Sequence, residues 1–253
     1  MDNPTRPTVV FLHGFGEDNR IWTAQVNWLK KDHPVLAPDL PGSGQNPALL
    51  PGTPSIEAMA DYVKNLLDEQ GITKAILIGH SMGGYIALAF AAKYPEQLSA
   101  IGLFHSTTYA DNEEKIAARR KGINFIRKNG AAAFLRQSIP NLFADTSRTQ
   151  HPEWVNHLIE KYAGFNPDSL VYYYEAMIHR PDRSALLQAF DKPVLFLIGE
   201  QDKTVPLNDS LQQAHMPSTA FIHILAGTGH LGMLEEEERS NKILKDFLDF
   251  VSH

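Results

Sequence analysis

Short apolar runs alternate with segments of helical period along most of this chain. The first run, TVVFLHG, begins at Thr8 and consists of β-branched and aromatic residues that a glycine interrupts, which is typical of a buried strand. Similar runs occupy 33–37, 74–78, 98–104, 193–198 and 220–225, and helical patterns occupy 20–30, 56–69, 84–93 and 236–250. This alternation predicts an α/β protein with a mostly parallel sheet covered by helices on both faces.

The bulk properties exclude several classes of protein. A chain of 253 residues with 43% hydrophobic and 21% charged residues is typical of one globular domain, and no run approaches the roughly 18 apolar residues of a membrane span. A formal charge of −6 argues against a nucleic-acid partner, and the absence of cysteine excludes disulfides and thiolate metal sites. Because residues 1–4 lack a basic stretch followed by an apolar one, we expect a cytoplasmic protein.

The stretch 109–190 breaks the alternation. It contains several helical patterns but no convincing strand, and Gly130, Pro140, Pro152, Pro167 and Pro181 separate them. A structureless loop of this length is implausible inside a compact domain, so we expect a helical lid over the carboxyl edge of the sheet. The predicted organisation is therefore a core sheet domain from 1–108 and 191–253, interrupted by a lid at 109–190.

The segment GHSMGG at 79–84 places a serine directly after a predicted strand and before a predicted helix. Glycines two positions before and after Ser81 permit the sharp turn that exposes its hydroxyl. The serine also stands at a helix N-terminus, where free N–H groups stabilise developing negative charge. The segment predicts a nucleophile at Ser81, and the alternative is a capped helix start with incidental glycines.

A serine hydroxyl needs a base to remove its proton, so a histidine and a carboxylate should follow elsewhere. Asp202 comes just after the run at 193–198, and His230 comes just after the run at 220–225. Both therefore stand beyond the carboxyl end of a predicted strand, where open sheets place their sites. This order predicts Asp202 as the orienting acid and His230 as the general base, with Glu200 as the alternative acid.

Five segments in this order resemble the α/β-hydrolase superfamily, in its esterase, lactonase and carbon–carbon-bond hydrolase branch. They are VVFLHGFG, DLPGSG, GHSMGG, GEQDKTVP and GTGHLGMLEE, and together they span nearly the whole chain. The resemblance implies an open, mostly parallel sheet of about six strands with a helical lid insertion. It also implies the catalytic roles of Ser81, Asp202 and His230.

Attack on a carbonyl carbon creates an oxyanion, and each backbone N–H donor aimed at it typically contributes a factor of about 10² to 10³ in rate. One expected donor is the N–H of Met82, directly after the nucleophile. By resemblance, the other is the N–H of Phe15, where Gly14 and Gly16 permit the loop to turn inward. The alternative for this loop is an ordinary glycine turn.

The lid should supply the walls of the substrate pocket. Six side chains are candidates for that pocket, and for most of them the alternative is a place in the hydrophobic core. They are His13, His80, His105, Phe143, Trp154 and Tyr173.

Two lid arginines admit two interpretations. Arg120 and Arg127 each stand four residues after an isoleucine on one predicted helix. They could line a cationic pocket for a carboxylate-bearing substrate, but the sequence favours long side chains on a solvated face.

Residues 1–7 are too few to supply the two strands that usually precede the first one in this superfamily. The strand at 33–37 should therefore lie at an edge of the sheet, with unpaired backbone groups. We expect either homodimerisation through this edge or its shielding by residues 1–7.

The sequence thus predicts hydrolysis of a small carboxylic ester through an acyl-enzyme intermediate, with no metal or organic cofactor. The same three residues would also serve a lactonase, a carbon–carbon-bond hydrolase or a lyase. A ligand receptor that retains this scaffold with slow turnover is the alternative from another class.

Overall fold

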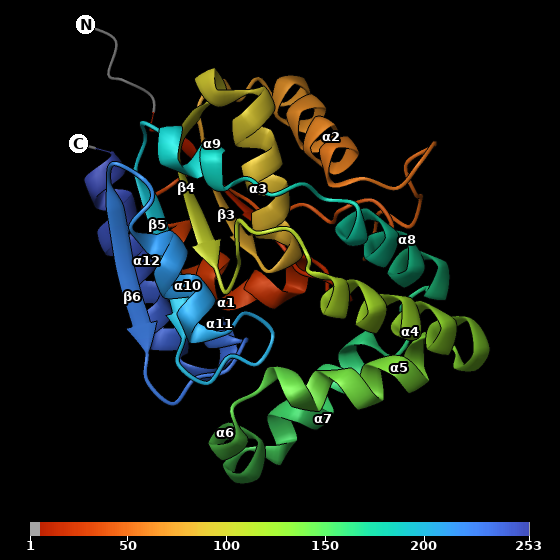
Figure 1. The fold of residues 1–253 in the computed structure, drawn as a ribbon. Helices are drawn as coiled ribbons and strands as arrows, with labels where there is room; N and C mark the ends of the chain where they lie inside the picture. Colours follow the sequence, from red (N-terminus) through yellow and green to blue (C-terminus); the bar gives the residue numbers. More distant parts are fainter. Residues whose placement is uncertain (1–5, 253) are drawn as a thin grey trace, which may run out of the picture.

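The computed structural model describes residues 6–252, whose six strands form one parallel sheet in the order β2-β1-β3-β4-β5-β6 (Figure 1). All five strand pairs are parallel, and each predicted run contains one of the strands or differs from it by one or two residues. The predicted α/β fold is therefore confirmed. The strands are β1 (Thr8–Leu12), β2 (Val35–Leu36), β3 (Ala75–His80), β4 (Leu98–Phe104), β5 (Val194–Gly199) and β6 (Ala220–Leu225).

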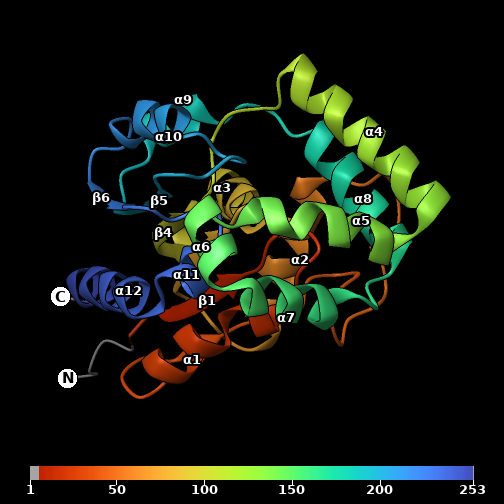
Figure 2. The ribbon, with the colours of Figure 1, turned by 90° about the horizontal axis from the view of Figure 1, so that it is seen from below.

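Helices cover both faces of this sheet (Figure 2). Val10 and Leu12 of β1 pack with α2 (Ile56–Glu69) and α3 (Met82–Lys93), and Val9 and Phe11 point to the other face. That second face packs against η1 (Asn19–Trp22), α1 (Thr23–Leu29), α11 (Gly232–Glu235) and α12 (Glu237–Val251). Because successive side chains of a strand point to opposite faces, a strand that is apolar throughout has two buried faces.

The chain between β4 and β5 forms helices, as the sequence predicts. Gly130 ends α4 with φ 82°, and proline is the first residue of both α7 and α8. The lid helices lie at the carboxyl ends of the strands (Figure 1). They are α4 (Glu113–Asn129), α5 (Ala131–Ser138), η3 (Ile139–Leu142), α6 (Asp145–Gln150), α7 (Pro152–Tyr162) and α8 (Pro167–Ile178).

One helix of the predicted lid segment belongs to the core instead. Helix α9 (Ser184–Ala189) lies back beside the sheet, where Leu187 joins the same buried cluster as Val194 of β5. The side chain of Arg183, just before it, pairs with Glu57 of α2. The last part of 109–190 therefore packs with the sheet domain. Two further short helices, η2 (Pro95–Gln97) and α10 (Leu207–Ala214), connect strands of the core.

The predicted edge strand is confirmed as β2, which is only two residues long and pairs with β1 alone. Arg6 donates a hydrogen bond to the carbonyl of Asp32 beside this edge, at 2.6 Å. The predicted shielding by residues 1–7 falls mostly on 1–5, which lie outside the described residues, and both this shielding and homodimerisation stay predictions. None of the helices formed by 6–252 combines the length and the apolar character that crossing a bilayer requires.

The close approach of α3 to β1 yields a stability prediction. A Cβ atom at Gly83 would lie 2.2 Å from the carbonyl oxygen of Leu12, whereas one at Gly164 would meet nothing within 4 Å. We expect Gly83→Ala to lower the free energy of unfolding by about 3 kcal/mol or more, because backbone atoms must move apart. Gly164→Ala should change it by less than about 1 kcal/mol. Urea unfolding of both variants measures the difference, and equal values would contradict this packing.

Candidate active site

Ser81 occupies a strained turn between β3 and α3. Its φ of 50° and ψ of −113° place a non-glycine residue at positive φ, and Gly79 and Gly83 make that turn possible. A Cβ atom at Gly79 would lie 2.2 Å from the carbonyl carbon of Gly83. The N–H of Ser81 donates to the carbonyl of Phe104 at 3.0 Å, and the hydroxyl of Ser106 donates to the carbonyl of Ser81 at 2.7 Å. The turn is therefore tied to the end of β4.

Asp202 and His230 form a buried pair beyond the ends of β5 and β6. Nδ1 of His230 lies 2.7 Å from Oδ2 of Asp202, and Oδ1 of Asp202 accepts from the N–H groups of Thr204 and Val205 at 2.8 and 2.9 Å. Burial opposes ionisation, but His230 and His105 together hold the pKa of Asp202 well below its usual range. An ionised carboxylate accepts a proton-bearing Nδ1, so Nε2 of His230 is left as the acceptor nitrogen.

Ser81 and His230 border the same cavity, which has a volume of about 260 Å³. Among the contacts of residues 6–252, no hydrogen bond joins the hydroxyl of Ser81 to the imidazole of His230. Catalytic hydrogen bonds are often long in a substrate-free enzyme and shorten in the substrate complex. The pairing of this nucleophile with this base therefore stays a prediction.

His105 lies behind Asp202 instead of in the cavity wall. It directly follows β4 at a φ of 49°, and its Nε2 accepts a hydrogen bond from the N–H of Gly232 at 3.1 Å. The proton of the neutral ring is therefore on Nδ1, 3.6 Å from Oδ2 of Asp202. Burial lowers the pKa of His105 to about 4, so this histidine is neutral at pH 7 and directs an N–H toward the carboxylate.

His80 pairs with a residue that the sequence motifs did not single out. Its Nδ1 lies 2.9 Å from Oε2 of Glu17, which also accepts from the N–H of Gly14 at 2.7 Å, and its Nε2 donates to the carbonyl of His230 at 2.9 Å. Burial works against both charges, but each partner stabilises the other: the pKa of Glu17 is lowered and that of His80 is raised. This buried ion pair joins the loop after β1, the serine turn and the backbone of His230.

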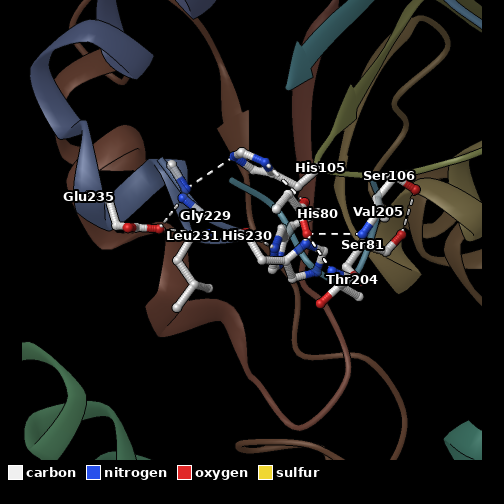
Figure 3. Close-up of polar contacts among 12 residues, drawn as sticks. His80, Ser81, His105, Ser106, Thr204, Val205, Gly229, His230, Leu231 and Glu235 are labelled. Atoms are coloured by element: carbon white, nitrogen blue, oxygen red, sulfur yellow. Dashed lines mark hydrogen bonds and ion pairs between the residues drawn. The ribbon is translucent and has the colours of Figure 1, made fainter. Parts of the chain in front are cut away.

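The loop that carries His230 is also held from the lid. The N–H of His230 donates to the carbonyl of Leu142 at 2.7 Å. Glu235 accepts from the N–H groups of Gly229 and Ala144 at 3.0 and 2.9 Å. Figure 3 shows Glu235 on one side of this loop and His80, His105 and Ser81 on the other. Glu235 lies within the GTGHLGMLEE segment, but nothing in that pattern reveals its bonds to the lid.

The two expected oxyanion donors are the backbone N–H groups of Phe15 and Met82. Phe15 borders the cavity in the loop after β1, and Met82 is the first residue of α3, directly after Ser81. Within 6–252, no hydrogen bond occupies the backbone N–H of either residue. Both N–H groups are therefore unpaired among the described residues, and their role as oxyanion donors stays a prediction.

Of the six pocket candidates from the sequence, His80 borders the cavity and the others lie elsewhere. His13 is buried under the loop 39–44, where its Nε2 accepts from the N–H of Leu40 at 3.1 Å. Phe143 is buried in the core, Trp154 stacks on the ring of His151, and Tyr173 donates to the carbonyl of Pro41. The apolar wall comes instead from Leu135, Ile139, Leu142, Leu158 and Met177.

Three buried side chains with metal-ligand atoms converge at this site. They are His105, Asp202 and His230, whose ligand atoms lie within 4.8 Å of one another. Both histidines direct Nδ1 at the same carboxylate oxygen, at 3.6 and 2.7 Å. The hydrogen bond from His230 to Asp202, with the ring of His105 nearby, accounts for this grouping, and we assign no metal to it.

A serine on a strained strand-to-helix turn, at the carboxyl edge of a parallel sheet that also carries a buried Asp–His pair, defines an α/β-hydrolase site. The chain belongs to the alpha/beta hydrolase fold family, whose family model matches residues 7–237.

Several known proteins are similar to this chain over nearly its whole length. A thermophilic esterase from Thermogutta terrifontis, solved with malate bound, is 30% identical with a TM-score of 0.92, covering 98% of this chain and 92% of that one. A 2-hydroxy-6-oxononadienedioate/2-hydroxy-6-oxononatrienedioate hydrolase of Paraburkholderia phymatum is 26% identical, covering 96% and 87%. A bifunctional biotin-biosynthesis protein of Cellvibrio japonicus is 27% identical over 98% of this chain, which spans about half (49%) of that relative's length.

The Glu17–His80 pair yields a pH-dependent stability prediction. We expect Glu17→Gln to lower the free energy of unfolding by about 3 kcal/mol at pH 5.5, because it leaves a buried imidazolium unpaired. Because the pKa of Glu17 is lowered, the contribution of Glu17 to stability is complete above its usual pKa of 4.5 and is lost as the pH falls. Because the pKa of His80 is raised, the contribution of His80 to stability is complete below its usual pKa of 6.5 and is lost as the pH rises.

Urea unfolding of both proteins from about pH 4 to 9 measures this effect. The difference in free energy of unfolding between wild type and Glu17→Gln should be largest between pH 4.5 and pH 6.5, the usual pKa values of the two groups, and smaller on either side. Glu69→Gln, at the exposed end of α2, serves as a control that should change stability little at any pH. A difference that is constant with pH would contradict the buried ion pair.

Proposed function

We propose that this protein hydrolyses a small carboxylic ester through an acyl-enzyme intermediate on Ser81. The observation that carries the proposal is the buried 2.7 Å contact between Asp202 and His230, with Ser81 bordering the same cavity as His230. An ionised aspartate fixes the tautomer of the histidine and stabilises the imidazolium that forms during proton transfer. This is the requirement that a serine nucleophile imposes on its base.

In the first half-reaction, the Oγ atom of Ser81 attacks the ester carbonyl carbon while its proton passes to Nε2 of His230. The carbonyl oxygen becomes an oxyanion that accepts hydrogen bonds from the N–H groups of Phe15 and Met82. The tetrahedral intermediate then collapses, the bond to the alcohol oxygen breaks, and His230 protonates the departing alcohol. An ester between Ser81 and the acyl group remains.

In the second half-reaction, His230 removes a proton from a water molecule, which attacks the acyl carbonyl carbon. The second tetrahedral intermediate uses the same oxyanion donors, and Ser81 leaves with the proton from His230. The products are one carboxylic acid and one alcohol, and the enzyme returns to its starting state.

The size and lining of the cavity support a small substrate. Its volume of about 260 Å³ is at the low end of ligand pockets, and leucine, isoleucine and methionine side chains form much of its wall. The similarity to the Thermogutta esterase, at 30% identity over nearly the full length, favours an ester over other carbonyl compounds.

A second candidate is hydrolysis of a carbon–carbon bond next to a ketone. The Paraburkholderia relative carries the name of such a hydrolase, and the same nucleophile and base would serve the reaction. The two functions differ in the leaving group, which is an alcohol oxygen in one and a carbanion equivalent in the other. Faster turnover of the 2-hydroxy-6-oxo acid in that name than of any short-chain ester would favour this second function.

The assigned roles predict which variants lose activity. We expect Asp202→Ala and His230→Ala each to reduce kcat/KM for a 4-nitrophenyl ester by about 10³-fold or more, because Ser81 then lacks an oriented base. A serine-directed fluorophosphonate should label Ser81 of the wild-type protein, and Ser81→Ala should abolish labelling. His215→Ala, at an exposed position, is the matched control and should keep full activity. Full activity of either triad variant would refute the assignment.

A further inference from the structure

One charged side chain in the cavity wall has no part in the proposed chemistry. Arg119 of α4 borders the cavity together with Ser81 and His230, and its side chain is 17% exposed. Arg120, the next residue, is exposed, as is Arg127. The two arginines that the sequence pattern singled out are thus on the solvated face of α4, and the cavity receives the adjacent one.

Asp111 holds the Arg119 side chain in place but does not use all of its hydrogen-bond donors. Its Nε donates to Oδ2 of Asp111, and its Nη2 donates to Oδ1 at 3.3 Å. The guanidinium carbon lies 5.5 Å from the centre of the Tyr174 ring. Among residues 6–252, Nη1 of Arg119 has no hydrogen-bond partner. One end of this guanidinium is therefore free to donate to a ligand.

The charges around Arg119 leave a surplus of one positive charge. Asp111 is fully buried, and it also pairs with Arg180, whose Nη2 lies 2.9 Å from Oδ1. Arg180 is committed elsewhere too: it donates to the carbonyls of Met177 and Tyr109 and stacks 4.0 Å from the Tyr85 ring centre. One carboxylate thus faces two guanidinium groups.

Among the cavity-lining residues of 6–252, no other group neutralises this surplus. Glu17 is paired with His80, and Asp202 lies behind His230. Burial raises the pKa of Tyr174 to about 12, so the phenol against Arg119 is uncharged at pH 7. A buried cation with unused donors is costly unless an anion pairs with it.

The position of Arg119 relative to the reacting atoms follows from ring contacts. The ring of Phe15, whose N–H is a proposed oxyanion donor, stacks on Tyr174 with centroids 4.2 Å apart. Arg119 contacts that same tyrosine ring. The guanidinium of Arg119 and the ring of Phe15 therefore both contact Tyr174, so one aromatic ring separates this cation from the loop that carries a proposed oxyanion donor.

We propose that Arg119 binds a carboxylate of the substrate, so that the preferred ester carries a negative charge at the far end of a short acyl chain. This proposal rests on the proposed function of Ser81. Guanidinium groups recognise carboxylates through paired, charge-assisted hydrogen bonds, which are about twice as strong as neutral ones. The substrate class is then a monoester of a short dicarboxylic acid.

Two esters that differ in one group test this directly. They are 4-nitrophenyl hydrogen adipate and 4-nitrophenyl hexanoate, in which a carboxylate replaces a terminal methyl group on the same six-carbon chain. We expect Arg119→Gln to reduce the ratio of kcat/KM for adipate over hexanoate by about ten- to hundred-fold. Asp111 keeps Arg180 as its partner in this variant, so the buried carboxylate is not left unpaired.

Arg120→Gln is the matched control, because it removes an arginine from the adjacent exposed position. It should leave the adipate-to-hexanoate ratio unchanged. The ratio in the wild-type protein is a readout that needs no variant, and we expect it to be at least one.

Equal loss of both activities in Arg119→Gln, or an unchanged ratio, would overturn the proposal. A wild-type protein that disfavours the adipate ester ten-fold would also overturn it. Hexanoate turnover and fluorophosphonate labelling of Ser81 report the proposed hydrolase function separately. If both fail, the proposed function is wrong; if both succeed and the ratio does not respond, only the role of Arg119 is wrong.

Discussion

The contact between Nδ1 of His230 and Oδ2 of Asp202 is the interaction around which this site is built. A buried carboxylate is costly in free energy unless several donors surround it. Here two backbone N–H groups, the ring of His230 and the nearby ring of His105 surround Asp202. Because the strands of a parallel sheet all end at one edge, these donors reach the same carboxylate from β4, β5 and β6.

The backbone of His230 is fixed as closely as its ring. His80 donates to its carbonyl, and Leu142 of the lid accepts from its N–H. His80 in turn is bound to Glu17, which accepts from the N–H of Gly14 in the loop after β1. The serine turn, the loop after β1, the loop that carries His230 and the lid therefore share one network of buried polar contacts. Such a network mainly fixes the positions of the catalytic groups. It adds less to the free energy of unfolding, because the desolvation of each ion pair offsets much of its attraction.

The sequence was sufficient for the sheet and for the positions of Ser81, Asp202 and His230 along it. Continuous apolar runs predict strands buried on both faces, and period-3.6 patterns predict the helices that cover them. Ser81 directly follows β3, and Asp202 and His230 lie three and five residues beyond β5 and β6. It was less informative about the lid, where the α9 segment looked like part of the insertion. The burial of Leu187 in the same cluster as Val194 depends on distant strands that no local pattern describes.

Two polar residues, Glu17 and Arg119, show why the rest of the site could not be predicted from the sequence. Glu17 belongs to no motif, and its role depends on His80, which is 63 residues away in the chain. On α4, pairing each arginine with the isoleucine four residues before it selected Arg120, but the buried stripe runs through Ile123 and Ile126 and includes Arg119. A rotation of 100° per residue separates a cavity-lining side chain from an exposed one.

The central claim is that the oriented His230 makes Ser81 a nucleophile that carries the acyl group. Rapid acid quench of the protein with a slowly hydrolysed ester, followed by peptide mass spectrometry, tests it most directly. We expect an acyl mass increment on the peptide that contains Ser81, formed and consumed at rates compatible with turnover. Turnover with no such adduct, or with the acyl group on another residue, would contradict it.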